Sequence, residues 1–552
     1  MTTLTATPLP QTADYSKLSP FELKDKLIGM ADEASKTRAA VMLNAGRGNP
    51  NWIATTPREA FGLMLTFGLE EARRTRDEPA VGLAGMPKSP GIAGRFEQFL
   101  RGVTGPGGVL LRRAVSYGVD QLGFDPDKFV WELTDAVIGD NYPVPDRMLV
   151  HCERIVQEYL AKEMCDGNPP PGKLDLFAVE GGTAAMTYIF HSLVTNKVLS
   201  RGDRIALGSP IFTPYLEIPH LKEYGFDVVM LEQSEMTDQG RHAWQYPEEE
   251  IRKLEDPSIK AFFLVNPSNP ASSAVRQETL RQIADIVRTK RPDLLILTDD
   301  VYGTFVEGFR SLYAEIPQNT ILVYSYSKHF GCTGWRLGIV GIHERNVIDR
   351  KIAGLPQEAR AELNERYGAL TLDPEGLKFI DRMVAESRAV GLNHTAGLSL
   401  PQQLQMALFS LFALLDDGET YKTRCRSICQ DRLKALCHGL GLELHDDSLR
   451  TGYYATLDVE AWANKNVGPG FMAYVNAHRD PLELVFALAN RHGTVLLNGS
   501  GFRGPPWSAR VSLANLDDAA YAQIGKNLAA VVKGAVEKWE AMGRPGPDIR
   551  RD

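Results

Sequence analysis

The centre of the chain alternates short apolar runs with longer amphipathic stretches. Stretches such as 183–200 and 277–290 repeat apolar residues at helical spacing, whereas the runs between them are short and rich in β-branched and aromatic residues. Seven of these runs are predicted strands: 174–180, 203–208, 226–232, 261–266, 294–300, 320–327 and 336–342. Near-continuous apolar strands that alternate with helices are typical of an α/β fold. We therefore expect a mainly parallel seven-stranded sheet covered on both faces, with ligands bound beyond the carboxyl ends of its strands.

The sequences on either side of this core show different patterns of apolar and polar residues. Residues 1–140 are mostly helical in pattern and form an N-terminal segment that we expect to divide between a small domain and a helical insertion. Residues 141–395 are the predicted large domain, with an insertion at about 343–394. Residues 396–552 mix helical and strand patterns and are the predicted C-terminal small α+β domain.

Composition and charge exclude several classes of function. The chain has 61 Lys and Arg against 69 Asp and Glu, a net charge of −8, so it lacks the basic surface that nucleic acid requires. The strongest apolar run, Met406–Leu415, spans only about half of the length that a bilayer needs, so we expect no membrane contact. The six cysteines show no metal-ligand spacing, and the N-terminus lacks a signal-peptide pattern. A reduced, cytoplasmic protein without a metal centre is expected.

The ends of the predicted strands carry the candidate chemistry. Lys328 follows one strand, and an amine there can form a Schiff base with an aldehyde cofactor. Arg336 lies eight residues later and can hold a phosphate group, although a surface lysine and a structural arginine are the alternative interpretation. Asp299 and Tyr302 close an earlier strand, where an acid can keep a pyridine nitrogen protonated. An acidic strand end that caps the next helix is the alternative for Asp299.

Three further motifs follow other strands. Asn269, in Asn-Pro-Ser-Asn-Pro, offers an amide to a ring oxygen or a carboxylate. Gly182 and Thr183 lie where a strand runs into a helix, so backbone N–H groups there can approach an anion. Phe212 follows the next strand and can stack on a cofactor ring.

These motifs occur in one consistent order, and together they resemble the aspartate-aminotransferase-like, fold-type I pyridoxal-phosphate enzymes of class I/II over roughly residues 44–534. The resemblance implies that pyridoxal 5'-phosphate is the cofactor, that Lys328 forms its Schiff base and that Asp299 pairs with its ring nitrogen. It further implies that Tyr302 and Asn269 bind its phenolic oxygen and that Phe212 stacks on its ring. The implied phosphate ligands are Gly182, Thr183, Ser325, Arg336 and, reaching into a neighbouring subunit, Tyr142. Arg510 is implied to bind the substrate α-carboxylate.

The length of the chain narrows the implied reaction. Extra residues lie between Gly48 and Tyr142 and between Ile342 and Thr395, and this long architecture resembles the bacterial aspartate 4-decarboxylases. That resemblance implies conversion of L-aspartate to L-alanine and CO2 with minor transaminase activity, in a homodimer that can assemble into a dodecamer. A plain amino-acid aminotransferase is the alternative. A dicarboxylic substrate needs a second cationic anchor. Arg47, beside the Gly48 backbone that should line the substrate site, is the candidate, with a helix-end or interface arginine as the alternative.

Two other residues have weaker signals. Thr395 lies in a loose motif where the family places a residue near the partner's phosphate, and His329 could relay a proton or act as a spacer after Lys328. A regulator fused to a DNA-binding module is a rival from another class, but residues 1–100 have balanced charges and no basic recognition helix.

Overall fold

The computed structural model describes residues 15, 18–38, 42–238, 240–391 and 397–547. Its centre is a seven-stranded sheet in which only β10 runs antiparallel to its neighbours. In spatial order the strands are β4 (Leu174–Val179), β10 (Gly338–His343), β9 (Thr320–Ser325), β8 (Leu295–Asp299), β7 (Ile259–Val265), β5 (Arg204–Ser209) and β6 (Asp227–Glu232). Every predicted strand is present, and the predicted α/β fold with a mainly parallel sheet is confirmed.

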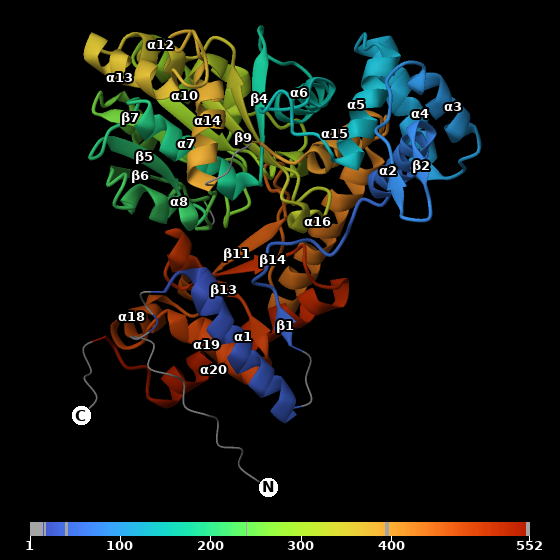
Figure 1. The fold of residues 1–552 in the computed structure, drawn as a ribbon. Helices are drawn as coiled ribbons and strands as arrows, with labels where there is room; N and C mark the ends of the chain where they lie inside the picture. Colours follow the sequence, from blue (N-terminus) through green and yellow to red (C-terminus); the bar gives the residue numbers. More distant parts are fainter. Residues whose placement is uncertain (1–14, 16–17, 39–41, 239, 392–396, 548–552) are drawn as a thin grey trace.

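Helices cover both faces of this sheet (Figure 1). On one face α7 (Gly182–Thr195) and α14 (Phe379–Gly391) enclose a core that contains Phe177 and Val340. On the other face α10 (Gln277–Thr289) packs over Phe262 and Leu264. Shorter helices complete this lobe: α8 (Pro214–Glu217), α9 (Glu248–Arg252), α11 (Leu312–Glu315), α12 (Val347–Ala353) and α13 (Gln357–Tyr367). Because β7, β8 and β9 are buried along almost their whole length, the loops at their carboxyl ends are held in fixed positions.

The first insertion is a helical subdomain that lies beside the sheet (Figure 1). Its helices are α2 (Thr56–Thr75), α3 (Ile92–Arg101), α4 (Pro106–Ser116) and α5 (Pro126–Ile138), with a small hairpin of β2 (Asp77–Glu78) and β3 (Leu83–Ala84). They share one apolar core with α6 (Val150–Met164) and α15 (Leu400–Leu414). Since α15 packs here and not in the small lobe, we propose that the boundary between the lobes falls after residue 396, within α16 (Thr420–Leu440).

The small lobe is built from both ends of the chain (Figure 1). Strand β1 (Leu43–Asn44), which follows α1 (Pro20–Arg38), pairs in parallel with β12 (Thr494–Val495). Strand β14 (Ser508–Ser512) lies between β11 (Tyr454–Asp458) and β13 (Leu497–Asn498) in a three-stranded antiparallel sheet. Its remaining helices are α17 (Val459–Asn466), α18 (Pro469–His478), α19 (Leu482–His492) and α20 (Asp518–Ala541). This arrangement brings β1, β11 and β14 toward the sheet of the large lobe.

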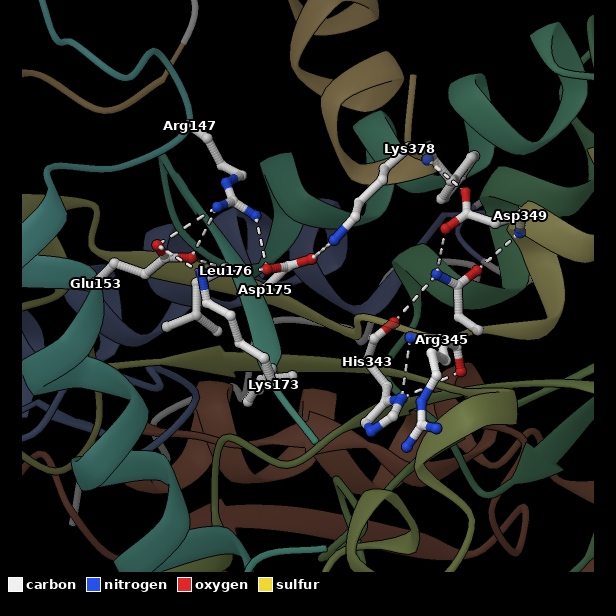
Figure 2. Close-up of polar contacts among 12 residues, drawn as sticks. Arg147, Glu153, Lys173, Asp175, Leu176, His343, Arg345, Asp349 and Lys378 are labelled. Atoms are coloured by element: carbon white, nitrogen blue, oxygen red, sulfur yellow. Dashed lines mark hydrogen bonds and ion pairs between the residues drawn. The ribbon is translucent and has the colours of Figure 1, made fainter. Parts of the chain in front are cut away.

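The second insertion is fastened to the edge of the large sheet by charged groups (Figure 2). Lys378, just before α14, donates to the Asp175 carboxylate of β4 at 2.8 Å. Arg147 contacts the same carboxylate at 3.3 Å and Glu153 at 3.1 Å. Asp349 of α12 accepts a bond from the Phe379 backbone N–H at 2.6 Å, which ties the two helices together. Across the described residues, every helix is too short or too polar to cross a lipid bilayer.

Candidate active site

Lys328 lies where the two lobes meet. It follows β9 directly, and its Nζ donates to the backbone oxygen of Gly48 at 3.0 Å. The Tyr453 hydroxyl donates to the same oxygen at 2.9 Å. A Cβ built on Gly48 would lie 2.7 Å from the Tyr454 hydroxyl oxygen and 3.2 Å from Lys328 Nζ, so only glycine fits this close approach. The predicted residues Lys328 and Gly48 are thus in contact, across lobes.

Asp299 is the last residue of β8, and its carboxylate is buried. The Tyr215 hydroxyl donates to Oδ2 at 2.5 Å and the Val301 N–H donates to Oδ1 at 3.3 Å. Burial raises the pKa of Asp299, while these hydrogen bonds and the charge of Lys328 oppose the rise. Among the described residues no Lys, Arg or His forms an ion pair with Asp299, so this carboxylate is available to a cationic ligand atom.

Arg510, in the centre of β14, is almost completely buried, with 1% of its surface exposed. Its Nη1 donates to Asn269 Oδ1 at 3.2 Å, and its Nη2 donates to the backbone oxygen of Gly46 at 2.9 Å. Its Nε has no hydrogen-bond partner, and no carboxylate within the described ranges neutralises the guanidinium. A buried, uncompensated guanidinium is costly unless an anion joins it, so the arrangement suits a carboxylate ligand. The predicted pair Arg510 and Asn269 is brought together.

Arg336 closes the turn before β10, and its guanidinium reaches the start of α7. Its Nη1 donates to the Thr333 backbone oxygen at 3.0 Å and its Nη2 to the Glu180 backbone oxygen at 3.2 Å. No acidic side chain of the described chain pairs with it. The positive charge and the amino terminus of α7 therefore point at the same place, which favours an anion such as a phosphate.

The sheet register places three of the other predicted phosphate ligands, Gly182, Thr183 and Ser325, near Arg336. Gly338 of β10 pairs with Val179 on one side and with Ser325 on the other. Only strand β10 therefore separates Ser325 of β9 from the turn in which β4 passes into α7. That turn ends at Gly182, the first residue of the helix, and no side chain caps the N–H groups of the first turn, which includes Thr183.

Tyr302 and Phe212 also lie near this centre. The Tyr302 hydroxyl donates to the Tyr454 hydroxyl at 3.0 Å. Phe212 follows β5, and its ring lies edge-on to those of Phe21, at 5.6 Å between centroids, and Tyr215, at 5.7 Å. Phe212 therefore contacts a tyrosine whose hydroxyl binds the Asp299 carboxylate.

Other predicted residues are not drawn into this cluster within one chain. Arg47 is exposed and makes no hydrogen bond or ion pair with any described residue. Tyr142, in the loop before α6, is 75% exposed. Thr395 lies outside the described residues. His329 is buried against Phe305, and burial, reinforced by nearby positive charges, lowers its pKa to about 3, so a neutral spacer fits better than a proton relay.

Three tyrosines of the site were missed by the sequence interpretation. Tyr453 and Tyr454 begin a predicted strand, and Tyr215 ends a motif in which only Phe212 was singled out. Their hydroxyl groups contact Gly48, Tyr302 and Asp299 respectively. The only sequence signal for them was their position next to predicted strand ends.

Comparisons with known proteins decide the family. Residues 178–527 match the model of the family "Aminotransferase class I and II". The chain belongs to this family. It is 46% identical over 530 residues to the "Bifunctional aspartate aminotransferase and L-aspartate beta-decarboxylase" of Pseudomonas sp, and the match covers 96% of this chain and 98% of the relative.

More distant relatives agree on the fold. A "Probable aspartate/prephenate aminotransferase" from Aquifex aeolicus is 23% identical over 292 residues, which cover 49% of this chain and 66% of that protein. The solved aspartate aminotransferase from Rhizobium meliloti superposes with a TM-score of 0.58 at 14% identity and covers 96% of this chain and 99% of its own. That of Thermus thermophilus with maleate gives a TM-score of 0.53 at 17% identity, over 95% of this chain and 100% of its own. The two solved structures show that this member of the family has the aspartate aminotransferase fold.

Proposed function

We propose that this chain is an aspartate 4-decarboxylase that converts L-aspartate to L-alanine and CO2 and retains minor aspartate transaminase activity. One observation carries the proposal: the similarity to the bifunctional Pseudomonas protein extends over 96% of the chain, so it includes both insertions. The site is consistent with an amino-acid substrate, because Arg510 offers a buried cation to a carboxylate and Lys328 offers an amine beside it.

Pyridoxal 5'-phosphate is the cofactor that these residues fit. Asp299 offers a buried carboxylate without an ion-pair partner among the described residues, which suits a protonated ring nitrogen. Arg336, Gly182, Thr183 and Ser325 surround an anion position at the start of α7. Tyr302 and Asn269 would hold the ring oxygen, Phe212 would stack on the ring and Lys328 would carry the covalent link. When bound, the cofactor supplies an electron sink for the bonds that break in the substrate.

The protein's own groups divide the remaining work. Arg510 and Asn269 bind the α-carboxylate and fix the substrate relative to Lys328. Lys328 takes the proton from Cα and later returns it. Arg47, next to Gly48, is the proposed second anchor for the dicarboxylic substrate. Tyr453 holds the Gly48 backbone in place through the 2.9 Å bond to its carbonyl oxygen.

Incubation of the pure protein with L-aspartate and no keto acid tests the proposal. A decarboxylase makes alanine over many turnovers, whereas a plain aminotransferase stops after one equivalent of amino groups is transferred. Lys328→Ala serves as the control, since it is expected to abolish both alanine formation and the absorbance of the covalently held cofactor. Wild-type protein that stops after a single turnover would establish the aminotransferase alternative, which the family match favours.

We propose that the working unit is at least a homodimer and that dimers can assemble further, up to a dodecamer. Tyr142 and Val144 are exposed to 75% and 76% in one loop, an unusual place for two large apolar side chains of a lone chain. Tyr142 then reaches the phosphate of a neighbouring subunit. Sedimentation of wild type and of Tyr142→Ala, with cofactor affinity measured in parallel, tests this: a fully active monomer would contradict it.

A further inference from the structure

A buried tyrosine faces Lys328 across the lobe interface. Tyr454, the first residue of β11, is 2% exposed, and its hydroxyl oxygen accepts a hydrogen bond from the Tyr302 hydroxyl at 3.0 Å. This oxygen and Lys328 Nζ both lie within 3.2 Å of the position that a Cβ on Gly48 would take. The phenol oxygen and the amine nitrogen are therefore less than about 6 Å apart, on the same side of the Gly48 backbone.

The surroundings of Tyr454 stabilise its ionised form more than those of the neighbouring tyrosines. The Arg510 guanidinium carbon lies 4.4 Å from the centre of its ring. Burial alone would raise the pKa of Tyr454, but the charges of Lys328 and Arg510 and the bond from Tyr302 outweigh burial and lower it. By contrast, burial raises the pKa of Tyr302 and of Tyr453 well above the ordinary value. Of these three phenols, Tyr454 gives up its proton most readily.

The proposed reaction consumes a proton that transamination does not need. Loss of CO2 leaves an electron pair at Cβ, and a proton must be added there to make alanine. Transamination only moves the Cα proton within the site, a task for Lys328 alone. Decarboxylation therefore requires a second acid.

The other acidic groups near Lys328 already donate their protons in hydrogen bonds or are assigned to the cofactor. Tyr302 is assigned to the ring oxygen of the cofactor, and Tyr453 donates to the Gly48 oxygen. The Cys332 thiol donates to the Tyr326 backbone oxygen at 3.1 Å. Asp299 is assigned to the ring nitrogen. The Tyr454 hydroxyl donates to no acceptor within the described part of the chain, so its proton is available.

We propose that Tyr454 is a catalytic acid that delivers the proton to Cβ after CO2 leaves, an assignment that rests on the proposed function. Lys328 first accepts the Cα proton. The bond between Cβ and the carboxylate carbon then breaks, its electron pair stays on the Cβ side and CO2 departs. The Tyr454 O–H bond breaks as the Cβ–H bond forms. Solvent restores the phenol proton, Lys328 returns its proton to Cα, and the sum is aspartate plus one proton giving alanine plus CO2.

Tyr454→Phe separates the two activities. We expect CO2 release from aspartate to fall at least about 100-fold, the lower range for a lost acid–base group. Oxaloacetate formation with 2-oxoglutarate as amino acceptor is expected to change by less than about fivefold, because Lys328 still moves the Cα proton. An equal loss of both activities, or unchanged CO2 release, would overturn the assignment. Wild type that releases no CO2 would instead overturn the proposed function.

Two measurements keep the proposal testable if Tyr454→Phe folds poorly. In wild-type holoenzyme the ratio of CO2 to oxaloacetate should fall as the pH rises through the pKa of Tyr454, because a phenolate cannot donate; a ratio independent of pH contradicts the proposal. Tyrosinate absorbance provides a readout apart from activity. One phenol should ionise below the ordinary tyrosine pKa of about 10 in wild type and in the matched control Tyr453→Phe. Lys328→Ala should move this ionisation to higher pH. An unchanged titration would contradict the proposed interaction between Lys328 and Tyr454.

Discussion

Replacing Gly48 with alanine tests whether the close approach of Lys328, Tyr454 and the Gly48 backbone is required. The φ angle of Gly48 is not in the left-handed region, so alanine can adopt its backbone conformation. The added Cβ, however, would lie 2.7 Å from the Tyr454 hydroxyl oxygen, closer than real contacts of this kind. Tyr454 is buried between Tyr302 and Arg510, so it cannot swing away freely. Either this ring or the Gly48 backbone has to move by roughly half an ångström.

Such a shift displaces the carbonyl that holds Lys328 and Tyr453. Because misplacement by about 1 Å can lower a rate about 100-fold, we expect kcat/KM for aspartate to fall roughly 10- to 100-fold, equivalent to about 1.4–2.7 kcal/mol. The free energy of unfolding should fall by about 1–3 kcal/mol, as for other overpacked sites. Steady-state kinetics and urea unfolding measure the two effects.

Gly62→Ala is the matched control, since a Cβ on Gly62 in α2 meets nothing within 4 Å. It should leave kcat/KM unchanged and raise stability by up to about 1 kcal/mol. If Gly48→Ala keeps kcat/KM within about twofold of wild type, the contact geometry of Gly48 is not needed for the reaction, and the assignment of this backbone to the site is refuted.

Three further predictions concern single residues. Arg510→Gln should lower kcat/KM for aspartate about 100-fold, since hydrogen bonds to a charged group contribute roughly 1.5–3 kcal/mol; an unchanged value contradicts its role at the α-carboxylate. Lys378→Met should cost up to about 1 kcal/mol in urea unfolding at neutral pH. Burial alone would raise the pKa of Asp175, but Lys378 and Arg147 lower it. The stabilisation is therefore complete above the ordinary carboxyl pKa and is lost as the pH falls through the lowered pKa. The difference in unfolding free energy between wild type and Lys378→Met should accordingly disappear in acid. His329→Phe should leave the pH–rate profile between about 5 and 8 unchanged, since the buried imidazole is neutral there. Loss of the acidic or basic limb of that profile would instead support the proton-relay interpretation.

The sheet and the residues at its strand ends could be predicted because their signals are local. Each strand shows as an apolar run, and the carboxyl end of a parallel strand points to the ligand side. Asp299 and Lys328 could therefore be placed at strand ends from sequence alone, and they lie there in the structure: Asp299 is the last residue of β8 and Lys328 follows β9. The α/β class followed from the same pattern.

Features that depend on contacts across the lobes could not be predicted in this way. Tyr454 begins a strand and has the sequence signal of an ordinary core aromatic residue. Its proposed role depends on Arg510, which the pairing of β11 with β14 brings beside it, and on Lys328, which meets it only where the small lobe packs on the large one. Likewise, α15 has no polar stripe to show that it packs with the helical insertion, and the role proposed for Tyr142 requires a second subunit.

Carbon-labelled substrate tests the central claim most directly. Wild-type holoenzyme is incubated, without keto acid, with L-aspartate labelled with 13C either at the side-chain carboxylate or at the α-carboxylate. With Arg510 at the α-carboxylate as proposed, many equivalents of labelled CO2 are expected from the side-chain label, whereas the α-label stays in alanine. Labelled CO2 from the α-carboxylate, or release that ends at one equivalent per site, would contradict it.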